Sequence, residues 1–446
     1  MIPGKSTTLL FNQGIRIPKT GTDRPAGPPV QVKARGRPFN HRALVVHSTD
    51  APLKLIERFA ITRGRAVPVD DAPGQQSASG RLAYYITPHG LGHAVRSLGV
   101  IRRLMDLAPE LEIVLVSALP QFIIKQNLPR PLPIRERHLD VGLVQQDSLR
   151  FDLEATREAL GSLRQRQQTL VDEEIRFFRA EGIQGIVCDV PFLPFLAAGR
   201  AGIPAVGLGN FTWDWIYQRY AERDRRWESL VAWIREAYRE CPLFLQLPMH
   251  GDCSACGTIR PVPLVARQAQ RTRKQTRRIL RLAESQKTYL VSFQSLNLEA
   301  EAERHLESMG ERIFLYKHPL RLRARNGLSL DDLDLSYADA VAAVDGVITK
   351  PGYGIVADCL VHGTPVIYTD RGLFPEYEIL VRALTEHLTT VYIPSAELYA
   401  GRWQEAIENL ESLPRRSPSL PANGAEACAR AIMDMLERRG AIPAST

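Results

Sequence analysis

The chain of 446 residues has no long apolar run. No stretch approaches the roughly 18 apolar residues that a membrane-spanning helix needs, and residues 1–12 lack the apolar core of a secretory signal peptide. Cysteine is also scarce: six residues are scattered between Cys188 and Cys428, which argues against a disulfide framework. We therefore expect a cytoplasmic protein with reduced thiols and no transmembrane segment.

Net charge is nearly absent from most of the chain, although the whole carries +8. The first 80 residues contain 12 Lys/Arg and 5 Asp/Glu, whereas the other 366 contain 45 and 44. A nearly neutral body argues against a nucleic-acid groove. Residues 1–80 are rich in Pro, Gly and Arg and show little periodicity, so we expect a mostly flexible basic extension.

From Arg81 onward, short apolar runs alternate with helical patterns in two successive series. Such alternation predicts parallel sheets covered by helices on both faces. An irregular, Pro-bearing connection at 241–266, followed by a basic helix at 267–283, separates the series. The expected fold is therefore α/β, with two Rossmann-like doubly wound domains facing each other across a cleft. The predicted parts are the extension (1–80), an N-terminal domain (81–265), a C-terminal domain (266–415), and a C-terminal helix and tail (416–446).

The first candidate ligand turn is His89-Gly-Leu-Gly-His93, which follows an apolar strand and opens a helix. Gly90 and Gly92 carry no Cβ, so a ligand can approach backbone N–H groups at the helix start. Asp189 and Asn210 each follow a later apolar strand. Because ligands collect at the carboxyl ends of parallel strands, we expect these residues and both histidines at one edge of the sheet.

The second candidate turn, Lys350-Pro-Gly-Tyr-Gly354, repeats this geometry in the other series. A diphosphate at the helix N-terminus would meet backbone N–H groups and the positive end of the helix dipole. Lys350 is a candidate phosphate ligand. Asp358 lies about one helical turn further on, where a carboxylate would meet ribose hydroxyls.

These motifs, together with Arg96-Ser97, Asp189-Val-Pro191 and Asn210-Phe-Thr-Trp-Asp-Trp215, resemble a glycosyltransferase-like family of GT-B type. Its members include the N-terminal half of plant arabinose kinases and, more distantly, the lipid-linked peptidoglycan GlcNAc transferase. The resemblance covers roughly residues 81 to 415. It implies that the N-terminal half binds a hydroxyl acceptor, that the C-terminal half binds a nucleotide-diphosphate sugar such as a UDP-sugar, and that the sugar is transferred in the cleft without a metal or other cofactor.

The resemblance also implies roles for single residues. Glycosyl transfer needs a base for the acceptor proton and stabilisation of the departing diphosphate. His93 is the first candidate for the base and His89 the second, with Asp189 orienting or replacing either. The acceptor-side residues are Gly90, Gly92, Asn210 and Asp214. The donor-side residues are Lys350, Gly352, Tyr353, Gly354, Asp358 and Glu376, of which Glu376 would bind sugar hydroxyls.

The chain departs from the family pattern at several positions. Ile355 and Asp358 stand where Thr and Glu are usual, and Phe293-Gln-Ser295 stands where a Phe-Gly-Gly turn is common. We expect no GHMP kinase half, so the kinase activity of the plant fusion is not carried over. Two alternatives stay open: a non-catalytic sugar-nucleotide-binding or regulatory protein, and a sugar-nucleotide epimerase.

Two further features have simpler explanations. The spacing His250-x-x-Cys253-x-x-Cys256 lacks a fourth metal ligand, and we expect an ordinary loop there. Seven basic residues between Arg267 and Arg281 would meet anionic headgroups at a membrane surface if the acceptor were lipid-linked, but a solvated linker helix is the simpler expectation.

Overall fold

The computed structural model describes residues 80–145, 151–416, 420–438 and 440. All of the described residues belong to one compact unit. The predicted flexible extension lies outside the described residues, except for Gly80. In the described ranges, no helix combines the length and the apolar character that crossing a bilayer requires.

The first sheet contains seven parallel strands in the order β3-β2-β1-β6-β7-β8-β9. Because β1 pairs with β2 on one side and β6 on the other, the strand order reverses at β1. The residues that follow β1 therefore stand at a topological switch point, where open α/β sheets bind ligands. The strands are β1 (Arg81–Ile86), β2 (Glu112–Val116), β3 (Ile134–Arg135), β6 (Gly185–Asp189), β7 (Ala205–Gly209), β8 (Leu243–Gln246) and β9 (Thr258–Pro261).

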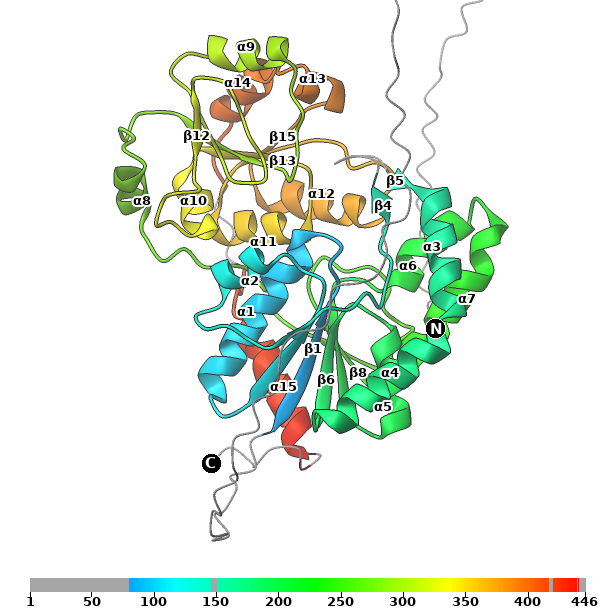
Figure 1. Ribbon diagram of the computed structural model, residues 1–446. Coiled ribbons are helices and arrows are strands. Elements are labelled where there is room, and N and C mark those ends of the chain that lie inside the picture. The colour runs from blue at the N-terminus through cyan, green and yellow to red at the C-terminus, as the bar shows by residue number, and fades with distance from the viewer. Residues whose placement is uncertain (1–79, 146–150, 417–419, 439, 441–446) are drawn as a thin grey trace, which may run out of the picture. The chain divides into compact units, whose positions relative to one another are not determined.

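Both faces of this sheet are covered by helices (Figure 1). Alternate side chains of β1 enter different apolar clusters: Leu82 and Tyr84 pack with α1 and α15, whereas Ala83 and Tyr85 pack with the helices of the other face. This is the two-residue period of a strand that is buried on both sides. The helices of the N-terminal half are α1 (Leu91–Leu107), α2 (Gln121–Asn127), α3 (Leu153–Gln165), α4 (Gln167–Ala180), α5 (Leu193–Ala201), α6 (Trp213–Ala221) and α7 (Glu228–Arg239), with a 3₁₀ turn η1 (Arg225–Trp227) and a small antiparallel pair β4 (Val144–Gln145) and β5 (Phe151–Asp152).

The second sheet has six parallel strands in the order β12-β11-β10-β13-β14-β15, and its order reverses at β10. The strands are β10 (Thr288–Ser292), β11 (Ile313–Tyr316), β12 (Gly327–Ser329), β13 (Gly346–Thr349), β14 (Val366–Tyr368) and β15 (Thr390–Tyr392). Its helices are α8 (Arg273–Ile279), α9 (Ala300–Ser308), α10 (Tyr337–Ala343), α11 (Tyr353–His362), α12 (Glu376–His387), α13 (Ser395–Tyr399) and α14 (Gln404–Ser412). The expected pair of doubly wound Rossmann-like sheets is confirmed.

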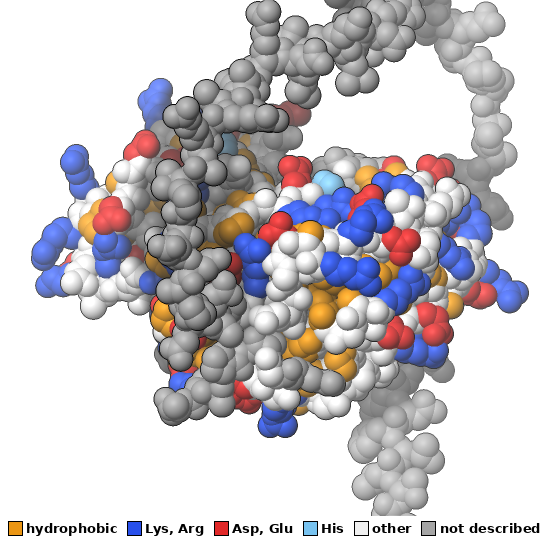
Figure 2. All heavy atoms as spheres, turned by 60° about the horizontal axis from the view of Figure 1, so that its bottom comes forward, with side chains coloured by type: hydrophobic (Ala, Val, Ile, Leu, Met, Phe, Trp, Pro, Cys, Tyr) orange, Lys and Arg blue, Asp and Glu red, His pale blue; other side chains and the backbone are white. Residues whose placement is uncertain are grey.

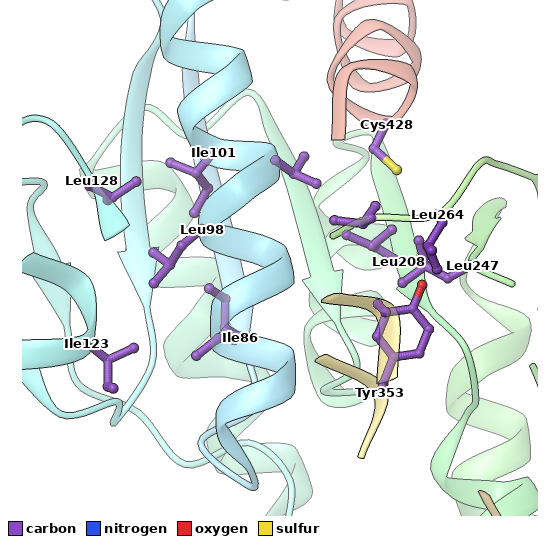
Figure 3. Packing of buried hydrophobic residues seen from close by; sticks show 14 of the residues in the cluster. Ile86, Leu98, Ile101, Ile123, Leu128, Leu208, Leu247, Leu264, Tyr353 and Cys428 are labelled. Atoms are coloured by element: carbon purple, nitrogen blue, oxygen red, sulfur yellow. The ribbon is translucent and has the colours of Figure 1, made fainter. Parts of the chain in front are cut away.

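The C-terminal helix α15 (Gly424–Arg438) packs against α1, and its Leu436 lies beside Gly185 of β6 in the first sheet. Arg103 of α1 donates a hydrogen bond to Glu426 over 2.8 Å. Cys428 of α15 faces the apolar cluster that also holds Leu208, Leu264 and Tyr353 (Figure 3). One continuous core therefore includes residues of both halves.

The expected basic helix at 267–283 is wrong in extent, because only residues 273–279 form α8. The backbone N–H groups that precede α8 donate hydrogen bonds to carboxylates: that of Arg267 donates to Asp358, and those of Gln270 and Arg271 donate to Asp339. Five of the seven basic side chains form ion pairs within the C-terminal half, namely Arg267, Arg271, Arg273, Lys274 and Arg277. The connection at 241–266, expected to be irregular, contains the two short strands β8 and β9.

On the face shown in Figure 2, Lys and Arg side chains alternate with Asp and Glu and with small apolar areas. On this face acidic side chains are interspersed among the basic ones, whereas recognition of a nucleic-acid backbone requires a broad positive field.

Candidate active site

The turn between β1 and α1 brings a helix N-terminus to the switch point of the first sheet. Thr87 donates its backbone N–H to the carbonyl of Asp189 over 2.8 Å, which aligns the ends of β1 and β6. Gly90 then adopts a φ of 97°, in the left-handed region that favours glycine, and α1 begins at Leu91. The tight turn before α1 therefore depends on glycine at position 90 for its backbone conformation.

The first turn of α1 touches the first turn of α11 directly. A Cβ added to Gly92 would lie 3.4 Å from the backbone nitrogen of Gly354, and one added to Gly354 would lie 3.2 Å from the Cα of Gly92. The two glycines thus allow two backbones to approach each other. This contact places the predicted acceptor-side turn against the predicted donor-side turn.

His93, in the first turn of α1, is hydrogen-bonded to Asp189 at the end of β6. The distance from His93 Nδ1 to Asp189 Oδ1 is 2.7 Å. Arg96, one turn further along α1, donates to both carboxylate oxygens over 2.6 and 2.7 Å, and Ser97 donates to Oδ2 over 2.6 Å. Arg96 also donates to Asn210 Oδ1 over 2.6 Å. All five side chains are buried, so the network is shielded from solvent.

The charges in this network fix the protonation of its members. Burial alone would raise the pKa of Asp189, but the nearby Arg96 and His93 outweigh burial and hold that pKa below its usual range. Burial and the positive Arg96 together lower the pKa of His93, against the opposing effect of Asp189. At neutral pH, therefore, Asp189 is ionised and His93 is neutral.

The hydrogen bond to Asp189 also assigns the tautomer of His93. An ionised carboxylate only accepts, so Nδ1 carries the proton and Nε2 keeps its lone pair. Arg96 Nη2, 2.8 Å from Nδ1, then donates to Asp189 rather than to the ring. Nε2 makes no hydrogen bond to the residues that the structure describes. A neutral imidazole with this nitrogen available has the form that a general base needs.

The donor-side turn follows β13 in the second sheet. Gly352 caps α11, whose first residue is Tyr353. The ring of Tyr353 is buried, with the Arg96 guanidinium 5.0 Å from its centroid. Lys350 lies directly after β13 and is partly buried. The backbone N–H groups at the start of α11 therefore lie close to the His93 network.

Glu376, the first residue of α12, connects the acceptor-side and donor-side parts of the candidate site through hydrogen bonds. Its Oε1 accepts a hydrogen bond from Asn210 over 2.7 Å, and its Oε2 accepts one from Arg371 over 2.7 Å. Arg371 donates through the same nitrogen to the carbonyl of Pro351, before the glycine turn, over 2.8 Å. A continuous set of hydrogen bonds thus connects the candidate base with the donor-side turn.

Two predicted site residues stand outside this set. Asp358 is almost fully buried, and its carboxylate accepts the backbone N–H and the guanidinium of Arg267. Asp214 accepts from Arg235 over 3.1 Å, and burial raises its pKa despite this partner. Neither contacts His93 or Glu376 through a hydrogen bond, and their roles as ribose and acceptor ligands stay predictions.

His89, the second base candidate, does not join Asp189. Its ring meets Trp213 edge-on, with centroids 6.4 Å apart, and its Nε2 lies 3.6 Å from Asp140 Oδ1. His93 in turn meets Phe211 edge-on at 5.3 Å. The two histidines of the turn therefore lie near different carboxylates, and His93 is the one that is hydrogen-bonded to its neighbour.

Sequence reasoning missed the roles of Arg96, Arg371 and Phe374. The spacing of Arg96, three residues after His93 on a helix, was the one signal that both face the same way. Phe374 belongs to the loop before α12, yet its ring packs with the apolar cluster of the first half, 6.1 Å from Phe211 and 5.8 Å from Phe151. No local pattern distinguishes that phenylalanine or Arg371 from ordinary loop residues.

Two cavities of about 420 and 380 Å³ lie away from the candidate active site, and neither is lined by a predicted site residue. The larger lies between α7 and the loop at 252–257, and the smaller lies between α12 and the segments at 248–249, 263–264 and 420–421. Across the described ranges, no group of three or more His, Cys, Asp or Glu side chains is placed to hold a metal ion.

The expected sequence resemblance is confirmed. No protein-family model matches the chain. The L-arabinokinase of Arabidopsis thaliana is 28% identical over 372 residues, which are 77% of this chain and 34% of the relative. The chain thus spans about a third of the length of this curated relative.

Solved structures share the fold at low sequence identity. The glycotransferase of kitacinnamycin is 15% identical, with a TM-score of 0.52 over 81% of this chain and 99% of that chain. A UDP-glucosyltransferase from Polygonum tinctorium capable of glucosylating indoxyl is also 15% identical, with a TM-score of 0.51 over 80% and 99%. The two-domain fold is accordingly of the GT-B type, as the sequence predicts.

Proposed function

We propose that the protein is a glycosyltransferase that moves a sugar from a nucleotide-diphosphate donor to a hydroxyl acceptor. The observation that carries this proposal is the position of the His93 and Asp189 pair beside the first turn of α11, fixed by the contact between Gly92 and Gly354. The GT-B fold shared with a UDP-glucosyltransferase supports a UDP-sugar as the donor. Similarity to L-arabinokinase supports a sugar as one of the ligands.

In this reaction the acceptor oxygen attacks the anomeric carbon, and the bond from that carbon to the diphosphate breaks. His93 Nε2 takes the acceptor proton, while Asp189 holds the ring and stabilises the imidazolium that forms. Arg96 keeps Asp189 ionised and in place. The acceptor therefore binds on the side of the first sheet, near Gly90, Gly92 and Asn210.

The departing diphosphate gathers negative charge, which the start of α11 is suited to meet. The backbone N–H groups of Tyr353 and Gly354 and the helix dipole favour an anion there. We assign Lys350 as an additional phosphate ligand and Glu376 as the ligand of sugar hydroxyls. Asn210 and Arg371 each donate one hydrogen bond to Glu376, and its two oxygens keep further lone pairs for sugar hydroxyls.

The test is the consumption of UDP-glucose, UDP-galactose, UDP-xylose and UDP-arabinose, measured as released UDP. Replacing His93 with glutamine should lower turnover by about 10² or more, since a positioned base contributes roughly 10²–10⁴, and should leave UDP binding intact. His387→Gln is the control, because His387 stands at the opposite end of α12 from Glu376. Equal turnover in the two variants would remove His93 from the mechanism.

Two contacts favour a second candidate function, a non-catalytic sugar-nucleotide-binding protein. Arg267 occupies the carboxylate of Asp358, and Arg96 shares the charge of Asp189 that would otherwise strengthen His93 as a base. This alternative predicts that UDP raises the melting temperature of the protein while no UDP-sugar is consumed.

A further inference from the structure

A second histidine and carboxylate face each other beside the His93 network. His89 Nε2 and Asp140 Oδ1 are 3.6 Å apart. Both atoms are buried, and neither has a hydrogen-bond partner among the described residues. The Asp140 side chain has no exposed surface. Leaving a buried polar atom unpaired costs about 1–3 kcal/mol, so folded proteins contain few such atoms.

The surroundings hold both side chains in place. The other oxygen of Asp140 accepts from Trp213 Nε1 over 2.9 Å. Gly142 lies under the imidazole of His89: a Cβ at Gly142 would stand 2.3 Å from the ring, and its φ of 67° favours glycine as well. Tyr217 donates its hydroxyl to the carbonyl of Gly142 over 2.7 Å. The position of His89 is therefore built into the fold rather than left to a mobile surface loop.

This pair stands on the acceptor side of the candidate site. Phe211 and Trp213, whose centroids are 5.2 Å apart, lie between the two imidazoles. The side chain of His89 is 30% exposed, against 10% for His93. The contacts that hold His89 all come from residues of the first sheet and its loops. The partly exposed side chain of His89 therefore belongs to the acceptor side of the candidate site.

We propose that His89 and Asp140 form a subsite that binds a second hydroxyl group of the acceptor, apart from the hydroxyl that His93 deprotonates. The subsite rests on the proposed transferase function. Asp140 is a positioning residue: its unpaired oxygen, 3.6 Å from Nε2, favours the tautomer of His89 with the proton on Nε2, which leaves the lone pair on Nδ1. Nδ1 then accepts a hydrogen bond from the ligand. The acceptor class is accordingly a polyhydroxy compound, such as a sugar or polyol, rather than a simple alcohol.

The tautomer of His89 tests the geometry without any substrate. In protein with ¹⁵N-labelled histidine, NMR distinguishes the Nε2–H form from the Nδ1–H form, and His89→Gln assigns the signal. Wild-type His89 should be the Nε2–H form, whereas His93 should be the Nδ1–H form. In Asp140→Asn, the Trp213 N–H still needs an acceptor, so the amide oxygen turns to Trp213 and the amide N–H₂ to His89. That variant should therefore convert His89 to the Nδ1–H form.

Ligand class is tested with two named probes in the presence of UDP. Myo-inositol should shift the His89 Nδ1 resonance of the wild type, and 1-propanol at the same concentration should not. Asp140→Asn should lose the response to myo-inositol. An Nδ1–H form in the wild type, or an equal or absent response to the two probes, would overturn the subsite. Failure of the transferase proposal itself would appear separately, as an absence of UDP-sugar consumption with the tautomers as assigned.

Discussion

Replacing Arg96 with methionine removes the cation that pairs with Asp189 in the candidate site. Methionine retains much of the aliphatic volume, but the hydrogen bonds to Asp189 and to Asn210 disappear. Removing one partner of a buried ion pair costs about 3–5 kcal/mol, because the other charge stays buried. Since His93 and Ser97 still contact Asp189, we expect the lower end of this range, about 3 kcal/mol of unfolding free energy. The pKa of His93 should rise at the same time, because Asp189 no longer shares its charge with Arg96.

Urea unfolding measures the first effect, and NMR titration of ¹⁵N-labelled histidine measures the second. Arg102→Met is the matched control, since Arg102 is exposed on the same helix and surface changes of this kind stay within about 0.5 kcal/mol. If Arg96→Met proves too unstable to titrate, Arg96→Lys keeps the charge but loses the fork that holds both oxygens. A loss below about 1 kcal/mol in Arg96→Met, or an unchanged His93 pKa, would refute the assigned electrostatics.

Two further predictions concern the contact between the turns and the effect of pH. Gly354→Val should lower the unfolding free energy by about 1–3 kcal/mol and abolish thermal stabilisation by UDP, because the valine side chain meets Gly92. The control is Gly352→Ala, whose added Cβ meets nothing within 4 Å, and this variant should retain the stabilisation by UDP. Equal behaviour of the two variants would contradict the contact between Gly92 and Gly354. Unfolding free energy should also fall as the pH drops through 6.5, since the pKa of His93 in the folded protein lies below that value and the unfolded chain takes up the proton first. His93→Gln should flatten this part of the pH curve, and an unaltered slope would speak against a neutral buried His93.

The sequence predicts the fold and the outline of the site because both follow from local patterns. Apolar runs that end in Asp189 and in Asn210 identify strands whose carboxyl ends must share one edge of a sheet. The glycine turns before α1 and α11 identify two helix N-termini. Once the strand order reverses at β1, His93 and Asp189 necessarily come together.

What the sequence leaves open depends on contacts between distant residues. Arg267 and Asp358 are 91 positions apart, and Asn210 and Glu376 are 166 positions apart, so no spacing rule connects them. The basic segment at 267–283 has a helical composition, yet carboxylates from α10 and α11 hold its first backbone groups outside a helix. Pairing between side chains of different elements overrides local propensity at these positions.

The measurement that tests the central claim most directly is a crystal structure of the protein with bound UDP. The account predicts the β-phosphate within hydrogen-bond distance of the backbone N–H of Tyr353 or Gly354, on the side of α11 that faces His93. A diphosphate bound away from the start of α11, or separated from His93 by the body of either sheet, would contradict it.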